Sequence, residues 1–122
     1  MAAYVIWLDH NEAEIFHLSA KGSQKENLKK NTHAHSNSHV DARERQENEQ
    51  FFHEIATKLK DAEEILIMGP GLAKNHLKTH FEKHHHAQLA AKIVGIESID
   101  RMTENQVLEK ARSFFKTYDA FH

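Results

Sequence analysis

The sequence predicts a single α/β domain in which an antiparallel meander continues into parallel strands, with helices packed on the mixed sheet. Two observations support this prediction. Near the N-terminus, short segments rich in strand-forming residues are separated by turn signals, as in a β-meander. Later, short apolar runs alternate with segments of helical periodicity, as in parallel β-α units. The length of 122 residues is usual for one domain, so we expect residues 1–122 to share one core.

The N-terminal region predicts three antiparallel strands. Residues 4–9 are apolar and rich in strand formers, and Asp9, His10 and Asn11 signal a turn. Residues 12–19 are expected to pair with the first strand. Lys21 and Gly22 signal a second turn, after which residues 24–28 add a third, shorter strand. This strand would form an edge of the sheet.

A polar segment separates the meander from the first helix. Residues 29–42 hold almost nothing to bury and predict a mobile, histidine-rich loop. A helix is predicted from residue 41 to about residue 60. Its first half is entirely polar, and an apolar stripe of Phe52, Ile55 and Leu59 begins only in the second half. We therefore expect the first turns to project beyond the body of the domain, with the loop at their tip.

Two β-α units complete the predicted fold. Residues 64–69 form an apolar run that predicts a buried parallel strand, and the turn Gly69-Pro70-Gly71 ends it. A helix over residues 72–84 and a strand over residues 92–98 follow. Thr103 and Gln106 have the spacing of a capping box and predict the start of the last helix.

Composition excludes several classes of protein. The chain has no cysteine, and therefore neither a disulfide nor a thiol nucleophile. No apolar run approaches the roughly 18 to 20 residues of a membrane span. The N-terminal apolar run is short and lacks the basic start of a secretory signal. We expect a soluble cytoplasmic protein with no membrane partner.

The formal net charge of -2 conceals two basic segments. Residues 21–45 hold six Lys and Arg against three Asp and Glu, and residues 72–92 hold four Lys against one Glu. Such segments can bind a polyanion locally. A solvated surface of mixed charge is the alternative. The candidate phosphate-binding cations are Lys29, Lys30, Arg43, Arg45, Lys74 and Lys78.

The Gly-Pro-Gly turn is a second candidate phosphate site. Gly69 and Gly71 lie between a predicted strand and a helix N-terminus, where backbone N–H groups and the helix dipole favour an anion, with Lys74 in the first turn. A tight turn without a ligand is the alternative.

Histidine is unusually frequent, with 12 residues. Three of them, His33, His35 and His39, lie in the polar loop, and His76, His80 and His84 follow one another at intervals of four. Two histidines at that spacing can share a zinc or nickel ion, but three span about 12 Å of helix axis, too far for one ion. We expect an exposed histidine surface that gains positive charge as the pH falls. The helical histidines are weak metal candidates, and no cofactor is predicted.

The order of elements, together with several motifs, resembles the middle domain of archaeal and eukaryotic peptide-release factors and of the ribosome-rescue factor Pelota. The resemblance rests on the strand ending in Asp9, the hairpin Glu12-Ala13-Glu14-Ile15-Phe16, the strand and turn of residues 65–71, and Lys92-Ile93-Val94-Gly95. The chain is still more similar to small bacterial proteins described as translational machinery proteins, which share Trp7-Leu8-Asp9 and the segment from Ala90 to Gly95. The resemblance covers nearly the whole chain. It implies a ribonuclease H-like three-layer fold and a link to ribosomes or tRNA.

One departure from the release-factor pattern bears on catalysis. Release factors carry Gly-Gly-Gln in the loop before the first long helix, and its glutamine helps water attack the peptidyl-tRNA ester. The corresponding stretch here, residues 33–39, has no glycine pair and no glutamine. The resemblance therefore implies no hydrolytic activity, and we predict no catalytic residue.

Three functional hypotheses follow. The first is a non-catalytic protein that docks on the ribosome, tRNA or rRNA through the basic loop and helix. The second is a metal-dependent nuclease using Asp9 and Glu97, although the sequence places no third carboxylate with them. The third is an accessory protein that forms a homodimer by pairing residues 24–28 across the sheet edge.

Overall fold

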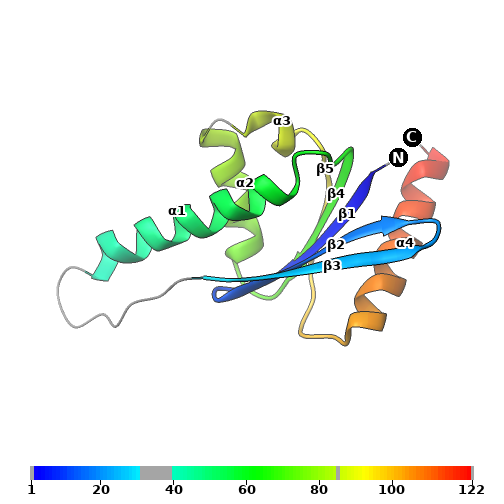
Figure 1. The fold of residues 1–122 in the computed structure, drawn as a ribbon, viewed down its shortest axis with the longest axis horizontal. Coiled ribbons are helices and arrows are strands. Elements are labelled where there is room, and N and C mark those ends of the chain that lie inside the picture. The colour runs from blue at the N-terminus through cyan, green and yellow to red at the C-terminus, as the bar shows by residue number, and fades with distance from the viewer. Residues whose placement is uncertain (1, 31–39, 85, 122) are drawn as a thin grey trace.

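The computed structural model describes residues 2–30, 40–84 and 86–121 (Figure 1). Within these residues the elements in chain order are β1 (Ala3–Leu8), β2 (Glu12–Ser19), β3 (Gly22–Lys29), α1 (Val40–Lys58), β4 (Glu64–Gly69), α2 (Ala73–Lys83), α3 (Ala87–Ala90), β5 (Ile93–Ser98) and α4 (Glu104–Phe121). None of the described helices is long and apolar enough to cross a membrane.

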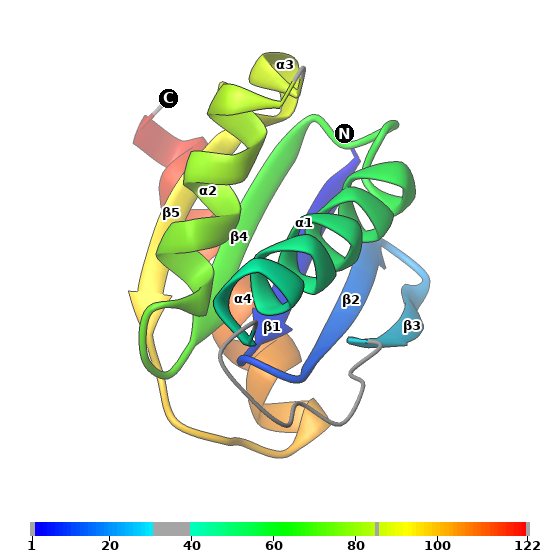
Figure 2. The same ribbon diagram turned by 90° about the vertical axis from the view of Figure 1, so that its left-hand side faces the viewer.

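The strands form one mixed sheet in the order β3-β2-β1-β4-β5. The meander β1-β2-β3 is antiparallel, whereas β4 pairs with β1, and β5 with β4, in parallel. Helices α1, α2 and α3 cover one face of this sheet and α4 covers the other (Figure 2). The predicted α/β class, with a mixed sheet between two helical layers, is confirmed.

Side chains of the central strands alternate between two cores. In β1, Tyr4 and Ile6 face α1 and α2, while Val5 and Trp7 face α4. The parallel neighbour β4 repeats this alternation with Ile65 to Met68, which are all fully buried. Strands buried on both faces need apolar residues at every position, which explains the unbroken apolar runs in the sequence.

The first helix projects as predicted. Residues 42–46 are exposed, Glu47 is buried, and the apolar core contacts begin with Phe51, Phe52 and Ile55 farther along α1. Figure 1 shows the N-terminal turns of α1 extending past the sheet. These turns bury little apolar surface, so their position is set mainly by the second half of the helix.

The capping box at the last helix is also confirmed. The backbone N–H of Gln106 donates to Thr103 Oγ1 over 3.2 Å, and the N–H of Thr103 donates to Gln106 Oε1 over 3.0 Å. These reciprocal bonds satisfy two backbone donors at the helix end and fix where α4 begins.

Most predicted boundaries hold to within one or two residues, and three features differ more. Strand β3 is longer than residues 24–28, because its ladder with β2 runs from Gly22 to Lys29 even though its side chains are mostly polar and exposed. The predicted loop of residues 29–42 is shorter, since Lys29 belongs to β3 and Val40 to α1; residues 31–39 lie outside the described part of the chain. The four-residue helix α3 was not predicted, because it is too short to show a periodicity.

Gly69 allows a close approach of two backbone segments at the end of β4. Its φ is +153°, and a Cβ atom there would collide with the carbonyl oxygen of Leu8. Gly22 has a similar φ of +140° but has nothing within 4 Å of the position of a Cβ atom. The two glycines share the same kind of backbone strain and differ in crowding.

We expect Gly69→Ala to destabilise the fold much more than Gly22→Ala. Backbone strain should cost about 1–3 kcal/mol at both positions, and the collision with Leu8 should add about 1–3 kcal/mol at Gly69 alone. Urea unfolding of the two variants and the wild type measures the difference. Equal losses of unfolding free energy would show that β1 and β4 separate easily at this point.

Candidate nucleic-acid interface

Four of the predicted phosphate-binding cations gather at one end of the molecule. Lys29 ends β3 and is exposed, and the Lys30 Nζ donates to Asn48 Oδ1 of α1 over 2.9 Å. Arg43 and Arg45 are exposed in the first turns of α1. These residues flank the segment 31–39, drawn in grey in Figure 1. The predicted histidines His33, His35 and His39 fall in that segment and lie outside the described residues.

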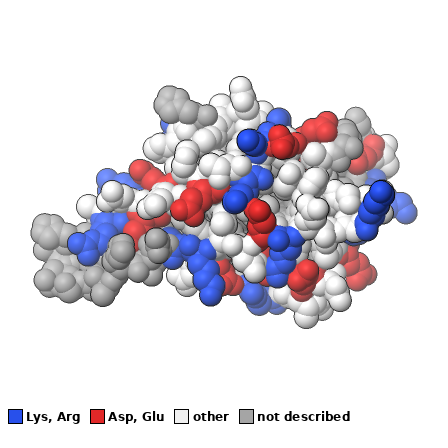
Figure 3. Space-filling view, in the orientation of Figure 1, with Lys and Arg blue, Asp and Glu red and all other residues white. Residues whose placement is uncertain are grey.

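The surface around this end carries both signs of charge. In Figure 3, Lys and Arg side chains next to the grey segment alternate with Asp and Glu side chains. Helix α1 itself contributes the exposed Glu44 and Glu49 beside its arginines. Cations and anions are therefore mixed around this end of the molecule, and no broad basic face is seen in this view.

A groove of about 220 Å³ runs between α1 and α2 next to this tip. Arg45 and Glu49 of α1 and Lys83 of α2 line it, together with Asn48, Phe52, Thr79, His76, His80 and His84. The groove continues the candidate interface from the tip along α2, where Lys78 is also exposed.

Lys74 corrects one of the predictions. Its side chain is only 4% exposed, and its Nζ donates to the carbonyl oxygen of Gly71. The lysine therefore closes the Gly69-Pro70-Gly71 turn and does not project from α2 toward a phosphate. Gly69 is buried against Leu8, while Gly71 is exposed with a φ of +61°. These contacts favour the structural role of the turn that the sequence left open.

His80 corrects a second prediction. His76 and His84 are exposed, but His80 is only 8% exposed, so the three do not form one solvent-facing row. The His80 ring stacks on that of His84, with centroids 4.4 Å apart, and lies 5.4 Å from the ring of Phe52 in α1. His80 thus belongs to the contact between α1 and α2.

Further histidines extend this cluster without making a metal site. The His86 ring lies 6.1 Å from that of His80 and 5.5 Å from that of His53. In the described part of the chain, however, no three His, Cys, Asp or Glu side chains are arranged to hold a metal ion. Among the described residues, His76, His80 and His84 therefore do not form a set of ligands for a metal ion.

Burial changes the acid–base behaviour of His80. Loss of solvent, reinforced by His84 and His86, lowers the pKa of His80 to about 4, and Glu49 opposes this shift only weakly. Its Nε2 is buried, and no described residue forms a hydrogen bond with it. His80 is therefore neutral near pH 7 and remains so well below pH 6, which excludes it as a pH-dependent cation for phosphate.

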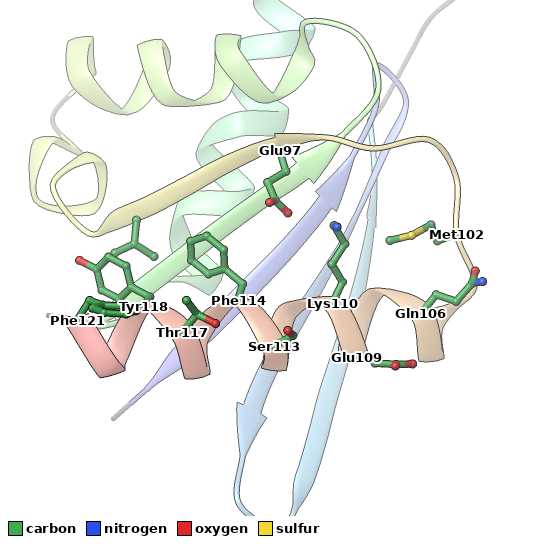
Figure 4. A pocket seen from close by; sticks show the side chains of 11 residues that line it. Glu97, Met102, Gln106, Glu109, Lys110, Ser113, Phe114, Thr117, Tyr118 and Phe121 are labelled. Carbon is green, nitrogen blue, oxygen red and sulfur yellow. The ribbon is translucent and has the colours of Figure 1, made fainter.

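The carboxylates proposed for a nuclease do not assemble into a site. Asp9 Oδ1 accepts the backbone N–H groups of Asn11 and Glu12 over 2.8 and 2.9 Å, which fixes the turn after β1. Glu97 lies on β5 and points toward α4 (Figure 4). Among the residues described, no cluster of three acidic or histidine side chains that could hold a metal includes either of them.

A larger groove, of about 890 Å³, lies between β5 and α4 and was not anticipated from the sequence. Met102 and Phe114 help to line it, and Glu97 points into it (Figure 4). The only sequence signal was the apolar face of α4, which equally predicts packing against the sheet.

A five-stranded mixed sheet between helical layers is also the fold found in translation termination and termination-like factors. An archaeal translation termination factor, aRF1, matches with a TM-score of 0.63 and 16% identity over 90% of this chain and 33% of that chain. Pelota from Thermoplasma acidophilum matches with a TM-score of 0.62 and 22% identity over 89% of this chain and 31% of that chain. Dom34 from S. cerevisiae is a translation termination-like factor involved in RNA quality control and interacting with Hbs1. It matches with a TM-score of 0.58 and 11% identity over 88% of this chain and 31% of that chain.

These matches confirm the resemblance to release factors and Pelota at the level of the fold. This chain spans about a third of the length of each of these proteins, consistent with their middle domain. No protein-family model and no curated protein sequence matches the chain. A common fold does not by itself transfer an activity, so the function has to be argued from the surface described above.

We expect His80 to make the fold less stable in mild acid. Because its pKa in the folded state, about 4, lies below the ordinary value of 6.5, the unfolded chain binds a proton first as the pH falls. The contribution of neutral His80 is therefore complete above pH 6.5 and is lost progressively between pH 6.5 and pH 4. The loss should be on the order of 2 kcal/mol.

Urea unfolding between pH 7.5 and pH 4.5 measures this effect. His80→Gln should flatten the pH dependence of the unfolding free energy, whereas the exposed control His76→Gln should retain the wild-type slope. An unchanged slope in His80→Gln would contradict the assignment.

Proposed function

We propose that the protein is a non-catalytic component of the translation machinery that docks on ribosomal RNA or tRNA through its basic, histidine-rich end. Lys29, Lys30, Arg43 and Arg45, together with the histidines of residues 31–39, would supply the phosphate contacts. Lys78 would extend the contact along α2. The solved structures that share this fold include translation termination and termination-like factors, which supports a role in translation.

The observation that carries the proposal is the projection of α1. Its first turns place two arginines beyond the sheet and beside Lys29 and Lys30, yet they add little to the core. A helix extension without buried apolar surface contributes little to stability. Stability therefore does not explain these turns, whereas the binding of their cations to a polyanion would.

Contacts of this type would set affinity and position and not sequence specificity. Each Lys or Arg that neutralises a phosphate releases a counterion, so binding weakens as salt is added. Phosphate contacts orient a protein on nucleic acid but carry no base information. The ribosome, which presents shaped RNA surfaces, fits such a mode better than a short sequence element does.

The proposed role is non-catalytic because the sequence lacks Gly-Gly-Gln between β3 and α1. Docking on ribosomes would place the protein in the cytoplasm. Strand β3 lies at an edge of the sheet, as predicted. A homodimer paired across that edge stays a prediction of its own and is not needed for docking.

Sucrose-gradient co-sedimentation with ribosomes at several salt concentrations tests the proposal. Wild-type protein should sediment with ribosomes at low salt and dissociate as salt rises. Arg43→Gln combined with Arg45→Gln should weaken binding and reduce the slope of log affinity against log salt by about 0.7–0.9 for each lost phosphate contact.

A matched control removes two positive charges elsewhere. Lys110→Gln combined with Lys116→Gln changes exposed lysines of α4, and should bind as the wild type does. Protein that stays at the top of the gradient at every salt concentration would overturn the function. Equal weakening by both double variants would mean that net charge, and not the α1 tip, governs the interaction.

A further inference from the structure

The β5 edge of the sheet differs from the β3 edge in chemistry. Strand β3 exposes a polar, charged row in which Lys25 pairs with Glu14 and Glu104 over 3.0 and 3.1 Å. Charged side chains of this kind protect an edge from pairing with another strand. The sequence of β5, Ile93–Ser98, contains no Lys or Arg and is largely apolar. Only the β3 edge carries this protection.

Backbone groups of β5 point away from the sheet at alternate positions. The N–H of Ile99 donates to the carbonyl oxygen of Gly69, which directs Glu97 and Ile99 toward β4. Because the direction of backbone hydrogen bonding alternates along a strand, Ile96 and Ser98 direct their N–H and C=O groups outward. These groups form a template on which a further strand can pair.

The groove between β5 and α4 opens next to this template. Its apolar lining comes from Val94, Met102, Phe114, Tyr118 and Phe121, and Phe121 is 80% exposed. Gly95 lets the Phe114 ring pack closely against β5, because a Cβ atom at this position would lie 2.6 Å from Phe114 Cζ. A large exposed aromatic beside an apolar groove is typical of a binding surface.

The groove also contains an unused negative charge. Glu97 Oε2 is buried and has no hydrogen-bond partner within the described coordinates. Figure 4 shows the Glu97 carboxylate directed into the groove, with Lys110 rising from α4 on the opposite side. Glu109 adds a second carboxylate, so the charged lining of the groove is acidic by one. A buried carboxylate oxygen without a partner is costly, and a cation from a ligand would satisfy it.

We propose that β5 and this groove bind an extended peptide segment of a partner protein. The segment adds a strand beside β5, places apolar side chains in the groove and sets a Lys or Arg side chain against Glu97. Main-chain bonds to an edge strand supply affinity in this mode, and pockets for alternate side chains supply specificity. The proposal concerns a different surface from the α1 tip and does not depend on RNA docking.

Charge favours this occupant over two others. A nucleic acid would bring phosphates toward Glu97 and Glu109, which repel them. A second copy of the chain pairing β5 with β5 would bring another Glu97 and no basic residue from that strand. A peptide with a basic residue among apolar ones satisfies both the edge and the carboxylate.

Selection from a displayed library of random 12-residue peptides provides the probe. The enriched sequences should alternate apolar residues and contain a Lys or Arg at a fixed position. One enriched peptide is then synthesised in three forms, unmodified and N-methylated at either one of the two alternating sets of amides, and each is titrated by fluorescence anisotropy. N-methylation of one set should abolish binding, because it removes the N–H groups that pair with β5, and N-methylation of the other set should be tolerated.

Variants of the protein locate the contact. Glu97→Gln and Phe121→Ala should each weaken the unmodified peptide about tenfold or more. Glu82→Gln, an exposed charge on α2, is the matched control and should bind normally. Phe121 is too exposed for its loss to unfold the domain, so its effect reports binding directly.

Four results would overturn the proposal. One is a library without enrichment over the unselected pool. Another is an enriched peptide that binds Glu97→Gln and Phe121→Ala as well as it binds the wild type. The third is undiminished binding by both N-methylated peptides, which would exclude strand addition. The fourth is a set of backbone amide NMR shifts on β5 that follow protein concentration instead of added peptide, which would assign the edge to a second copy of the chain.

Discussion

The double burial of the parallel pair β1–β4 is the constraint on which the rest of the structure depends. Ile65 to Met68 have no solvent exposure, and Ile6 and Trp7 face opposite cores from the neighbouring strand. A strand of this kind is stable only when helices cover both faces of the sheet. The pair therefore requires α1 and α2 on one side and α4 on the other. Gly69 permits the close approach of β4 to Leu8, so the turn that leads into α2 starts from a fixed point.

That constraint also explains which parts of the fold the sequence predicts. The central strands, the apolar half of α1 and the capping box at Thr103 follow from local patterns, because burial there leaves a periodic apolar signal. Strand β3 is predicted only in part, because an edge strand pairs through its backbone and its side chains are mostly polar, so it has no periodic apolar pattern. Helix α3 is held by backbone bonds from Leu89 and Ala90 to His86, which no side-chain pattern records.

The residues of the candidate interface also fall into those that the sequence predicts and those that it does not. Exposed cations such as Arg43 and Lys78 could be predicted, because charge and exposure go together in most surface helices. Lys74 and His80 could not be assigned by residue type, although their spacing from Leu77 by three positions gives the helical signal that they share its buried face. The groove between β5 and α4 has no local signal, because it arises from how far one helix lies from one strand.

The two proposed surfaces lie on parts of the fold that need not communicate. The α1 tip extends from one end of the molecule, whereas the β5–α4 groove lies along the opposite edge of the sheet from β3 (Figures 1 and 2). Between them stands a sheet whose central strands are largely buried. Coupling between two sites requires an element with two alternative packings. Because the structure contains a single packing of this sheet, we expect a ligand on one surface to leave affinity at the other unchanged. Two independent surfaces would instead provide proximity: a peptide held by β5 while α1 contacts RNA would be kept at a high effective concentration near that RNA. On these two proposals, the domain acts by bringing two molecules together.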